Sequence, residues 1–149
     1  MVESGTGDGK NSDSGAGWIP VVAGALKGVD GRWLMHRRPL HKHHGGLWEF
    51  PGGKVEPSEI PIESLVRELR EELGIEIDAR HCVPVAFAEE PKIPGRSAIV
   101  ILLYRIEQWM GEPAALEGEA IGWFSPEEIA ALDKPPLDIA LALRLFMNG

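Results

Sequence analysis

The stretch that decides the fold runs from Gly53 to Ile75 and reads GKVEPSEIPIESLVRELREELGI. Its second half predicts a helix of about three to four turns. Pro61 suits the first helical position, and Gly74 supplies the left-handed residue that commonly ends a helix. Ile60 stands where a hydroxyl-bearing N-cap is expected, so the helix start lacks that side-chain bond. Apolar residues recur at helical spacing and are expected to bury one face: Ile62, Leu65, Val66, Leu69 and Leu73.

Three carboxylates occupy a single arc beside that apolar face. Glu68, Glu71 and Glu72 stand at positions i, i+3 and i+4, so their side chains are neighbours on the helix surface. Such a group repels itself unless a cation lies between its members, and Mg²⁺ typically uses a few carboxylates together with substrate phosphates. The alternative, as on an ordinary helix, is a solvated acidic face. The spacing of the residues in and before the helix has to distinguish this from a metal site.

That spacing resembles the Nudix box. Gly53, Glu59 and the run Arg67–Ile75 match the box at its defined positions. The flanking segment Trp48–Glu56, WEFPGGKVE, is similar to the same region of the MutT nucleotide pyrophosphohydrolases. The resemblance extends from about Trp18 to the C-terminus and implies an α/β fold, an α/β/α sandwich with a mixed β-sheet between helices. The order of strands and helices along the chain suggests the same class.

Composition limits the domain count and the partners. The 149 residues suffice for one domain. We expect residues 1–17, rich in Gly, Ser and Asp, to be a disordered tail and residues 18–149 to form the Nudix domain. A net charge of −8 argues against a nucleic-acid polymer or an anionic membrane as partner. It does not argue against a free nucleotide, because bound divalent cations invert the local field.

Cysteine usage and hydropathy indicate the compartment. The lone Cys82 excludes an intrachain disulfide, fits a reducing compartment and is expected to be buried. No apolar run is long enough to span a membrane, and no secretory signal is recognisable, so a cytoplasmic location is expected. The sequence leaves the oligomeric state open.

The remaining elements follow from apolar alternation and turn residues. We expect a strand at Trp18–Leu26 to form a hairpin with a second strand at Arg32–Arg37, and Ser97–Ile106 to be a central strand covered on both faces. The capping box that begins at Ser125 should start a short helix. Further expected elements are a strand within Ala79–Ala88, a strand at Ala120–Phe124 and a helix at Leu137–Met147.

The loop Pro39–Leu47 holds three histidines, His41, His43 and His44. A metal site is one interpretation of these side chains. Their mixed spacing in a glycine-containing segment favours a solvated loop near the substrate phosphates.

The Nudix resemblance implies further ligands and supporting residues. The carbonyl of Gly52 would be a metal ligand, and Glu117, in the loop Gly111–Gly118, would be a further carboxylate ligand; ordinary loop surface is the alternative for Glu117. Glu68 and Glu117 are both candidates for the base that activates water. Arg67 stands four residues before Glu71 and is expected to orient it, whereas Glu59 is expected to be structural.

The resemblance also points to substrate-binding residues. Arg38 would contact phosphate or the base edge, with an ordinary exposed arginine as the alternative, and Arg96 is expected to bind substrate as well. Phe50 would line a base pocket or pack in the core. Asp138 stands where MutT enzymes specific for 8-oxoguanine carry asparagine. A carboxylate only accepts hydrogen bonds, so it favours exocyclic amines such as cytosine N4, or binds 8-oxoguanine after protonation. Asp138 also suits a helix N-terminal position.

The resemblance implies a Mg²⁺-dependent pyrophosphohydrolase, with Mn²⁺ as a possible substitute. The expected substrate is a free (deoxy)nucleoside triphosphate, split to monophosphate and pyrophosphate, with 8-oxo-dGTP as the main expectation. CTP, dCTP or a modified pyrimidine triphosphate is the alternative. A non-catalytic nucleotide sensor is the alternative from another class, but such a module usually has a damaged box, whereas this chain keeps all three helix glutamates.

Overall fold

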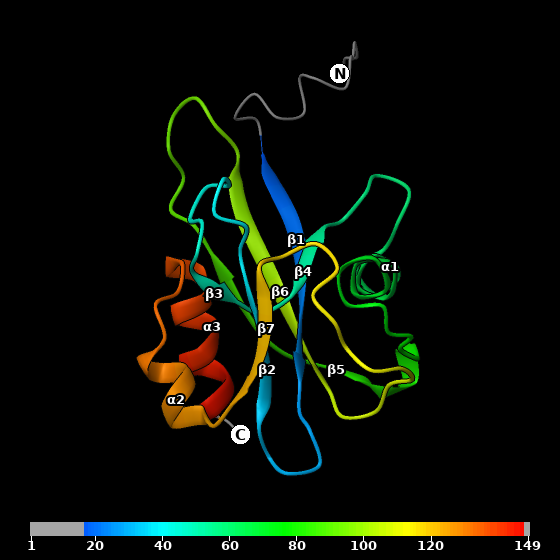
Figure 1. The fold of residues 1–149 in the computed structure, drawn as a ribbon. Helices are drawn as coiled ribbons and strands as arrows, with labels where there is room; N and C mark the ends of the chain where they lie inside the picture. Colours follow the sequence, from blue (N-terminus) through cyan, green and yellow to red (C-terminus); the bar gives the residue numbers. More distant parts are fainter. Residues whose placement is uncertain (1–16, 148–149) are drawn as a thin grey trace.

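The computed structural model describes residues 17–147 of the chain. The expected disordered tail, residues 1–17, lies outside this range apart from Gly17. The strands form a central layer, with α1 on one side and α2 and α3 on the other (Figure 1). This arrangement confirms the predicted α/β/α sandwich. The helices are α1 (Pro61–Leu73), α2 (Pro126–Ala131) and α3 (Pro136–Met147).

The central layer consists of two sheets. The first has the strand order β4-β1-β6-β5, in which β1 and β6 are parallel and both outer strands are antiparallel to their neighbours. Its strands are β1 (Trp18–Leu26), β4 (Gly52–Lys54), β5 (Cys82–Glu89) and β6 (Ala98–Ile106). The second is antiparallel, with the order β3-β2-β7. Its strands are β2 (Trp33–Arg37), β3 (Trp48–Glu49) and β7 (Ala120–Phe124). The predicted mixed sheet and the predicted inner position of β6 are confirmed.

The predicted hairpin between the first two strands is wrong. A tight turn does follow β1, with the Gly31 N–H donating to the Gly28 carbonyl at 3.0 Å. In the described residues, the two segments are then joined by the Gly28 N–H, which donates to the Arg32 carbonyl at 2.8 Å, and by the isolated bridge between Lys27 and Trp33, but not by a strand ladder. Both edges of β1 are already paired, one with β4 and the other with β6, so β2 enters the second sheet instead.

Helix α1 begins and ends where its sequence predicts. Pro61 is its first residue, and Gly74 adopts a left-handed conformation with φ of 73°, where its N–H donates to the Arg70 carbonyl at 3.0 Å. Ile60 supplies no side-chain cap, but Glu63 Oε1 accepts the Ile60 N–H at 3.0 Å. Half of a capping box is therefore enough to start this helix.

The apolar side chains form two clusters, one on each face of the strand layer. Leu65, Leu69 and Leu73 of α1 are fully buried against β1 residues such as Val22 and Leu26. On the opposite face, Ile129 of α2 and Leu141, Ala142 and Leu145 of α3 pack with residues of β1, β2 and β6. Each cluster ties one helical layer to the strands, so the loops at the strand ends hold fixed positions relative to both layers.

The strand expected within Ala79–Ala88 begins after the first three residues of that range. Residues Ala79–His81 form a 3-10 turn, capped by Asp78, whose side chain accepts the Arg80 N–H. The strand then starts at Cys82, which is buried and free as expected. No helix in the described part of the chain is long and apolar enough to cross a membrane.

The packing of α1 gives a test of the fold. Leu69 has no exposed surface, whereas Leu143 of α3 is 58% exposed. Leu69→Ala should lower the free energy of unfolding by about 2–5 kcal/mol, because it leaves a cavity between α1 and β1. Leu143→Ala, the matched control, should change it by less than about 0.5 kcal/mol. Urea unfolding followed by circular dichroism measures both, and equal effects would contradict this packing.

Candidate functional site

The site is built where α1 lies against the two glycines of β4. A Cβ on Gly52 would overlap the Val22 carbonyl oxygen, and a Cβ on Gly53 would overlap the Glu68 carboxylate. Backbone therefore excludes a side chain at Gly52, whereas a side chain at Gly53 would displace the Glu68 carboxylate. The absence of these side chains lets the carboxylate of Glu68 rest directly on the strand backbone.

Glu72 enters the same space from the next turn of the helix. Its Oε1 accepts the Gly52 N–H at 3.2 Å. Burial raises the pKa of Glu72 to about 9, and the negative charges of Glu68 and Glu49 add to the rise. Burial also raises the pKa of Glu68, although Arg67 opposes that change. The protein thus gathers more negative charge than its own cations neutralise, which favours a bound cation.

Arg67 donates hydrogen bonds to two carboxylates of this cluster. Its Nη1 donates to Glu68 Oε2 at 3.2 Å and to Glu71 Oε1 at 3.3 Å. Its Nη2 donates to the Lys54 carbonyl at 3.2 Å, so the same side chain ties β4 to α1. The predicted contact between Arg67 and Glu71 is present.

Glu59 has the structural position that was expected of it. Its two oxygens accept from Arg67, and Oε1 also accepts from the Ser64 hydroxyl. Hydrogen bonds from Arg67 and Ser64 lower the pKa of Glu59 to about 2. Glu59 therefore fixes the segment before α1 and leaves the other carboxylates to a ligand.

The carboxylates of this cluster are hydrogen-bonded to other groups of the protein and are not arranged around a common point. Within residues 17–147, no three carboxylate, imidazole or thiol side chains are arranged to hold one metal ion. Glu68 and Glu71 both turn toward Arg67 Nη1, while Glu72 turns toward Gly52. The donor set nevertheless fits a divalent cation, because it consists of hard oxygens crowded around an open glycine backbone. Arg67 takes one oxygen of each neighbour, so Glu68 Oε1 and Glu71 Oε2 could hold such an ion while Arg67 keeps the other oxygen.

The loop after β6 brings Glu117 to the same place. Ala114 N–H donates to the Leu73 carbonyl and Leu116 N–H to the Glu72 carbonyl, both at 3.0 Å, so the loop caps the end of α1. Glu117 follows directly and is exposed. Its charge adds to the raised pKa of both Glu68 and Glu72. The loop thus places a further carboxylate beside the cluster.

Asp138 lies at the start of α3, on the other side of the strand layer. It is 5% exposed, and its Oδ1 accepts the Phe50 N–H at 3.1 Å. This bond runs to the segment between β3 and β4 and not to the helix of Asp138 itself. Burial raises the pKa of Asp138 to about 7, with the charge of Glu49 adding to the rise. Asp138 is therefore a mixture of acid and carboxylate at neutral pH.

The other predicted substrate residues are only partly brought together. Arg38 Nη1 donates to Glu49 Oε1 at 2.8 Å, and its Nε donates to the His43 carbonyl at 2.8 Å. The Phe50 side chain belongs to a core cluster, which is the alternative its sequence position left open. Arg96 is exposed and forms an ion pair with Glu90 of its own loop. Within the described residues, no hydrogen bond or ion pair joins Arg96 to Asp138.

The loops that carry Arg96 and the three histidines lie at the same end of the molecule (Figure 1). His41, His43 and His44 are all exposed, as expected for a solvated loop. Partial desolvation, together with the neighbouring side chains of His43 and Arg38, lowers the pKa of His44.

Two residues of this region were missed by sequence reasoning. Glu49 lies between the two halves of the site, because its charge raises the pKa of both Glu72 and Asp138. His36, 3% exposed, is its partner across β2 and β3. The sequence signal that could have identified them is a polar or charged residue within an otherwise apolar segment, His36 in WLMH and Glu49 in LWEF.

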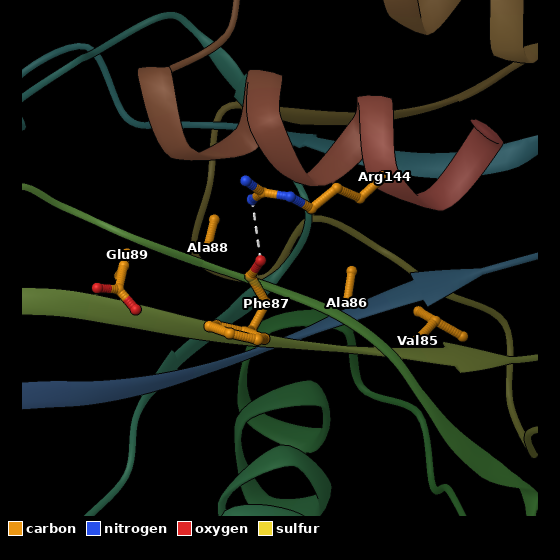
Figure 2. Close-up of a pocket in the computed structure, with 6 residues that line it drawn as sticks. All are labelled: Val85, Ala86, Phe87, Ala88, Glu89 and Arg144. Carbon is orange, nitrogen blue, oxygen red and sulfur yellow. Dashed lines mark hydrogen bonds between the residues drawn. The ribbon is translucent and has the colours of Figure 1, made fainter. Parts of the chain in front are cut away.

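Two open pockets lie away from this cluster. One, of about 490 Å³, lies between α3 and β5, where Arg144 Nη1 donates to the Phe87 carbonyl at 2.9 Å (Figure 2). The other, of about 590 Å³, lies beside the turn after β1 and the stacked rings of Trp109 and Trp123. Neither pocket is lined by Glu68, Glu72 or Asp138. The carboxylate cluster is therefore the candidate site because of its chemistry and not because of a deep cavity.

Known proteins resemble this chain over most of its length. The family model described as the NUDIX domain matches residues 18–144. The CTP pyrophosphohydrolase of Escherichia coli is 41% identical over 129 residues, covering 87% of this chain and 91% of that protein. The 8-oxo-dGTP diphosphatase of Escherichia coli is 31% identical over 131 residues, covering 85% and 95%.

A solved structure agrees in fold as well. The solution structure of the Escherichia coli ORF135 protein matches with a TM-score of 0.75 at 40% identity, covering 88% of this chain and 89% of that chain. The family model accounts for nearly all of the described residues, including α1, both sheets and most of α3. The chain therefore belongs to the Nudix family of hydrolases, enzymes that use divalent metal ions and act on free nucleotides.

Proposed function

We propose that this protein hydrolyses a free (deoxy)nucleoside triphosphate to the monophosphate and pyrophosphate, with Mg²⁺ as its metal and Mn²⁺ as a substitute. The observation that carries the proposal is the crowding of Glu68 and Glu72 onto the bare backbone of Gly52 and Gly53. This is an oxygen-rich site with an uncompensated negative charge, next to a backbone that a triphosphate can approach closely.

The chemistry requires a water in line with one phosphorus and neutralisation of the charge that moves onto the leaving oxygens. A bound divalent cation supplies that neutralisation and acidifies water. The Gly52 carbonyl and the carboxylates of Glu68, Glu71, Glu72 and Glu117 would hold it. Glu68 and Glu117 are the two candidates to accept the proton of the attacking water. Arg67 would keep Glu71 on the correct side of the helix, through the contact of 3.3 Å that it already makes.

The nucleobase of the substrate would be recognised beside the segment between β3 and β4, on the α3 side of the strand layer. Asp138 is bonded to the Phe50 backbone, while Arg38 is held by Glu49 at the same strand end. Arg96 would reach the substrate from the loop between β5 and β6. A protonated Asp138 both donates and accepts, as the amide of asparagine does, and so suits the O6 and ring N–H of an oxidised guanine. We therefore propose 8-oxo-dGTP, or a similar damaged nucleotide, as the substrate.

A pyrimidine triphosphate is the second candidate. The ionised form of Asp138 is an acceptor only and suits an exocyclic amine such as cytosine N4. The higher identity to the CTP pyrophosphohydrolase, 41% against 31% for the 8-oxo-dGTP diphosphatase, also favours it. A sensor without turnover is the weaker alternative, because such a module usually has a damaged box, whereas Glu68, Glu71 and Glu72 are all present in this chain.

We propose a free nucleotide, and neither a nucleic-acid polymer nor a membrane, as the partner of this acidic protein, whose net charge is −8. A cytoplasmic location would suit both this substrate and the buried free thiol of Cys82.

A panel of triphosphates tests the proposal. Wild-type protein with Mg²⁺ should release pyrophosphate from 8-oxo-dGTP with a higher kcat/KM than from dGTP, CTP, dCTP or their modified forms. Glu71→Gln should lower kcat at least about 10²-fold with an unchanged far-UV circular dichroism spectrum, because the Glu71 side chain is 49% exposed. Glu63→Gln, on the same helix but bonded to the Ile60 N–H, is the control and should keep its rate.

The outcomes of the panel separate the alternatives. A kcat/KM for dCTP analogues ten times that for 8-oxo-dGTP would reject the role in removing oxidised guanine. No Mg²⁺-dependent release from any nucleotide would favour the sensor.

Asp138→Asn should shift selectivity toward oxidised guanine. The amide donates and accepts at every pH, whereas Asp138 loses its donor as it ionises. The ratio of kcat/KM for 8-oxo-dGTP to that for dCTP should therefore rise at least threefold at pH 8. The rise should be smaller at pH 6, where Asp138 is mostly protonated. Ratios that equal those of the wild type at both pH values would remove Asp138 from the base pocket.

The raised pKa of Asp138 also predicts the pH dependence of stability. Between about pH 4 and pH 7 the unfolded chain has lost the proton that the folded chain keeps, so stability falls as pH rises through that window. Below and above the window this group adds no further dependence. Asp138→Asn removes the effect and should gain roughly 1–3 kcal/mol relative to wild type between pH 5 and pH 8. Urea unfolding at pH 5 and at pH 8 measures the free energy of unfolding of both proteins. The same difference between variant and wild type at both pH values would contradict the burial of an ionisable Asp138.

A further inference from the structure

His36 is a buried imidazole whose nitrogens lack hydrogen-bond partners. It is 3% exposed, and in the described part of the chain neither Nδ1 nor Nε2 makes a hydrogen bond. A histidine ring always carries at least one N–H, and a buried donor without a partner is costly. Such groups are rare in folded proteins, so this one calls for a physical explanation.

One nitrogen of His36 faces Glu49. Nδ1 lies 3.6 Å from Glu49 Oε2, across the pair of β2 and β3. The other oxygen of Glu49 is already held by Arg38 Nη1 at 2.8 Å. A movement of a few tenths of an ångström would bring Nδ1 within ordinary hydrogen-bond distance of Oε2. His36 and Arg38 therefore lie next to different oxygens of one carboxylate.

The other nitrogen of His36 lies under the loop that carries Glu117. A Cβ built on Gly118 would overlap Nε2 and Cε1 of the ring, so the backbone of Gly118 rests directly on the imidazole. On one side of Gly118, the Glu119 N–H donates to the Arg37 carbonyl at 3.0 Å. On the other side, the Leu116 N–H donates to the Glu72 carbonyl at 3.0 Å. Glu117 thus lies between two backbone anchors, and His36 supports the turn between them.

We propose that His36 is a positioning residue that holds the Glu49 carboxylate through Nδ1, beneath the turn that carries Glu117, and so keeps Glu49 next to the carboxylates of the metal site. It would act through Glu49 and would not touch the substrate. The inference rests on the proposed function, because it concerns the carboxylates assigned there to the metal ion.

Two substitutions of similar shape separate positioning from packing. Asparagine and leucine both branch at Cγ, but only asparagine keeps an N–H close to the position of Nδ1. Packing alone would favour His36→Leu, since leucine is larger and apolar in a buried space. Positioning of Glu49 favours His36→Asn. The two explanations therefore predict opposite orders.

The first readout is Mn²⁺ binding to nucleotide-free protein, measured by isothermal titration calorimetry. His36→Leu should raise the Kd for Mn²⁺ at least threefold, and His36→Asn should stay within twofold of wild type. The second readout is the kinetics of the best triphosphate, where His36→Leu should lower kcat at least tenfold with KM within twofold. His81→Leu, at an exposed histidine of the 3-10 turn, is the control and should change neither value. Thermal unfolding of each variant shows that the compared proteins are folded.

The order of the two variants decides the outcome. Mn²⁺ affinity and kcat that are equal in both variants, or higher in His36→Leu, would overturn the positioning role. Failure of this inference alone would leave a wild-type enzyme that binds Mn²⁺ and hydrolyses triphosphates. Failure of the proposed function would appear in the wild type itself, as absent Mn²⁺ binding or absent turnover, and would overturn both.

Discussion

The close approach of α1 to the backbone of β4 is the constraint on which the structure depends. Glycine at positions 52 and 53 leaves space for the Val22 carbonyl oxygen and the Glu68 carboxylate, respectively. The apolar face of α1 drives this approach, because Leu65, Leu69 and Leu73 are fully buried behind it. Hydrophobic packing thus forces acidic side chains against peptide backbone, an arrangement that ordinary surface helices avoid.

The electrostatic consequence is a site whose charge is only partly neutralised. Arg67 neutralises Glu59 and contacts Glu68 and Glu71, but it does not contact Glu72 within the described residues. Burial, together with the charges of Glu68 and Glu49, raises the pKa of Glu72 to about 9. Burying like charges together lowers stability, and functional sites are where proteins tolerate such conflicts. In the same crowded cluster, Glu68 and Glu71 accept from Arg67, and Glu72 accepts from the Gly52 N–H.

A short segment joins the two halves of the site. Glu49 and Phe50 lie between the strand pair of His36 and the glycines of β4. The Phe50 N–H reaches Asp138 on α3, and the charge of Glu49 affects both Asp138 and Glu72. Substrate recognition and metal binding would therefore share the short connection between β3 and β4, where the charge of Glu49 influences the ionisation of groups on both sides.

The sequence by itself determined what depends on neighbouring residues. Helix α1 with its ends, the acidic arc and the capping box at Ser125 follow from spacings of a few residues, and the structure has each of them. Contacts between distant segments decided the rest. Pairing of β1 with β4 and β6 sent β2 to the other sheet. Burial raised the pKa of Asp138, whose partner, the Phe50 N–H, is 88 residues away in the sequence. The place of His36 between Glu49 and Gly118 likewise exists only after three strands and a loop have met, because local spacing carries no information about such distances.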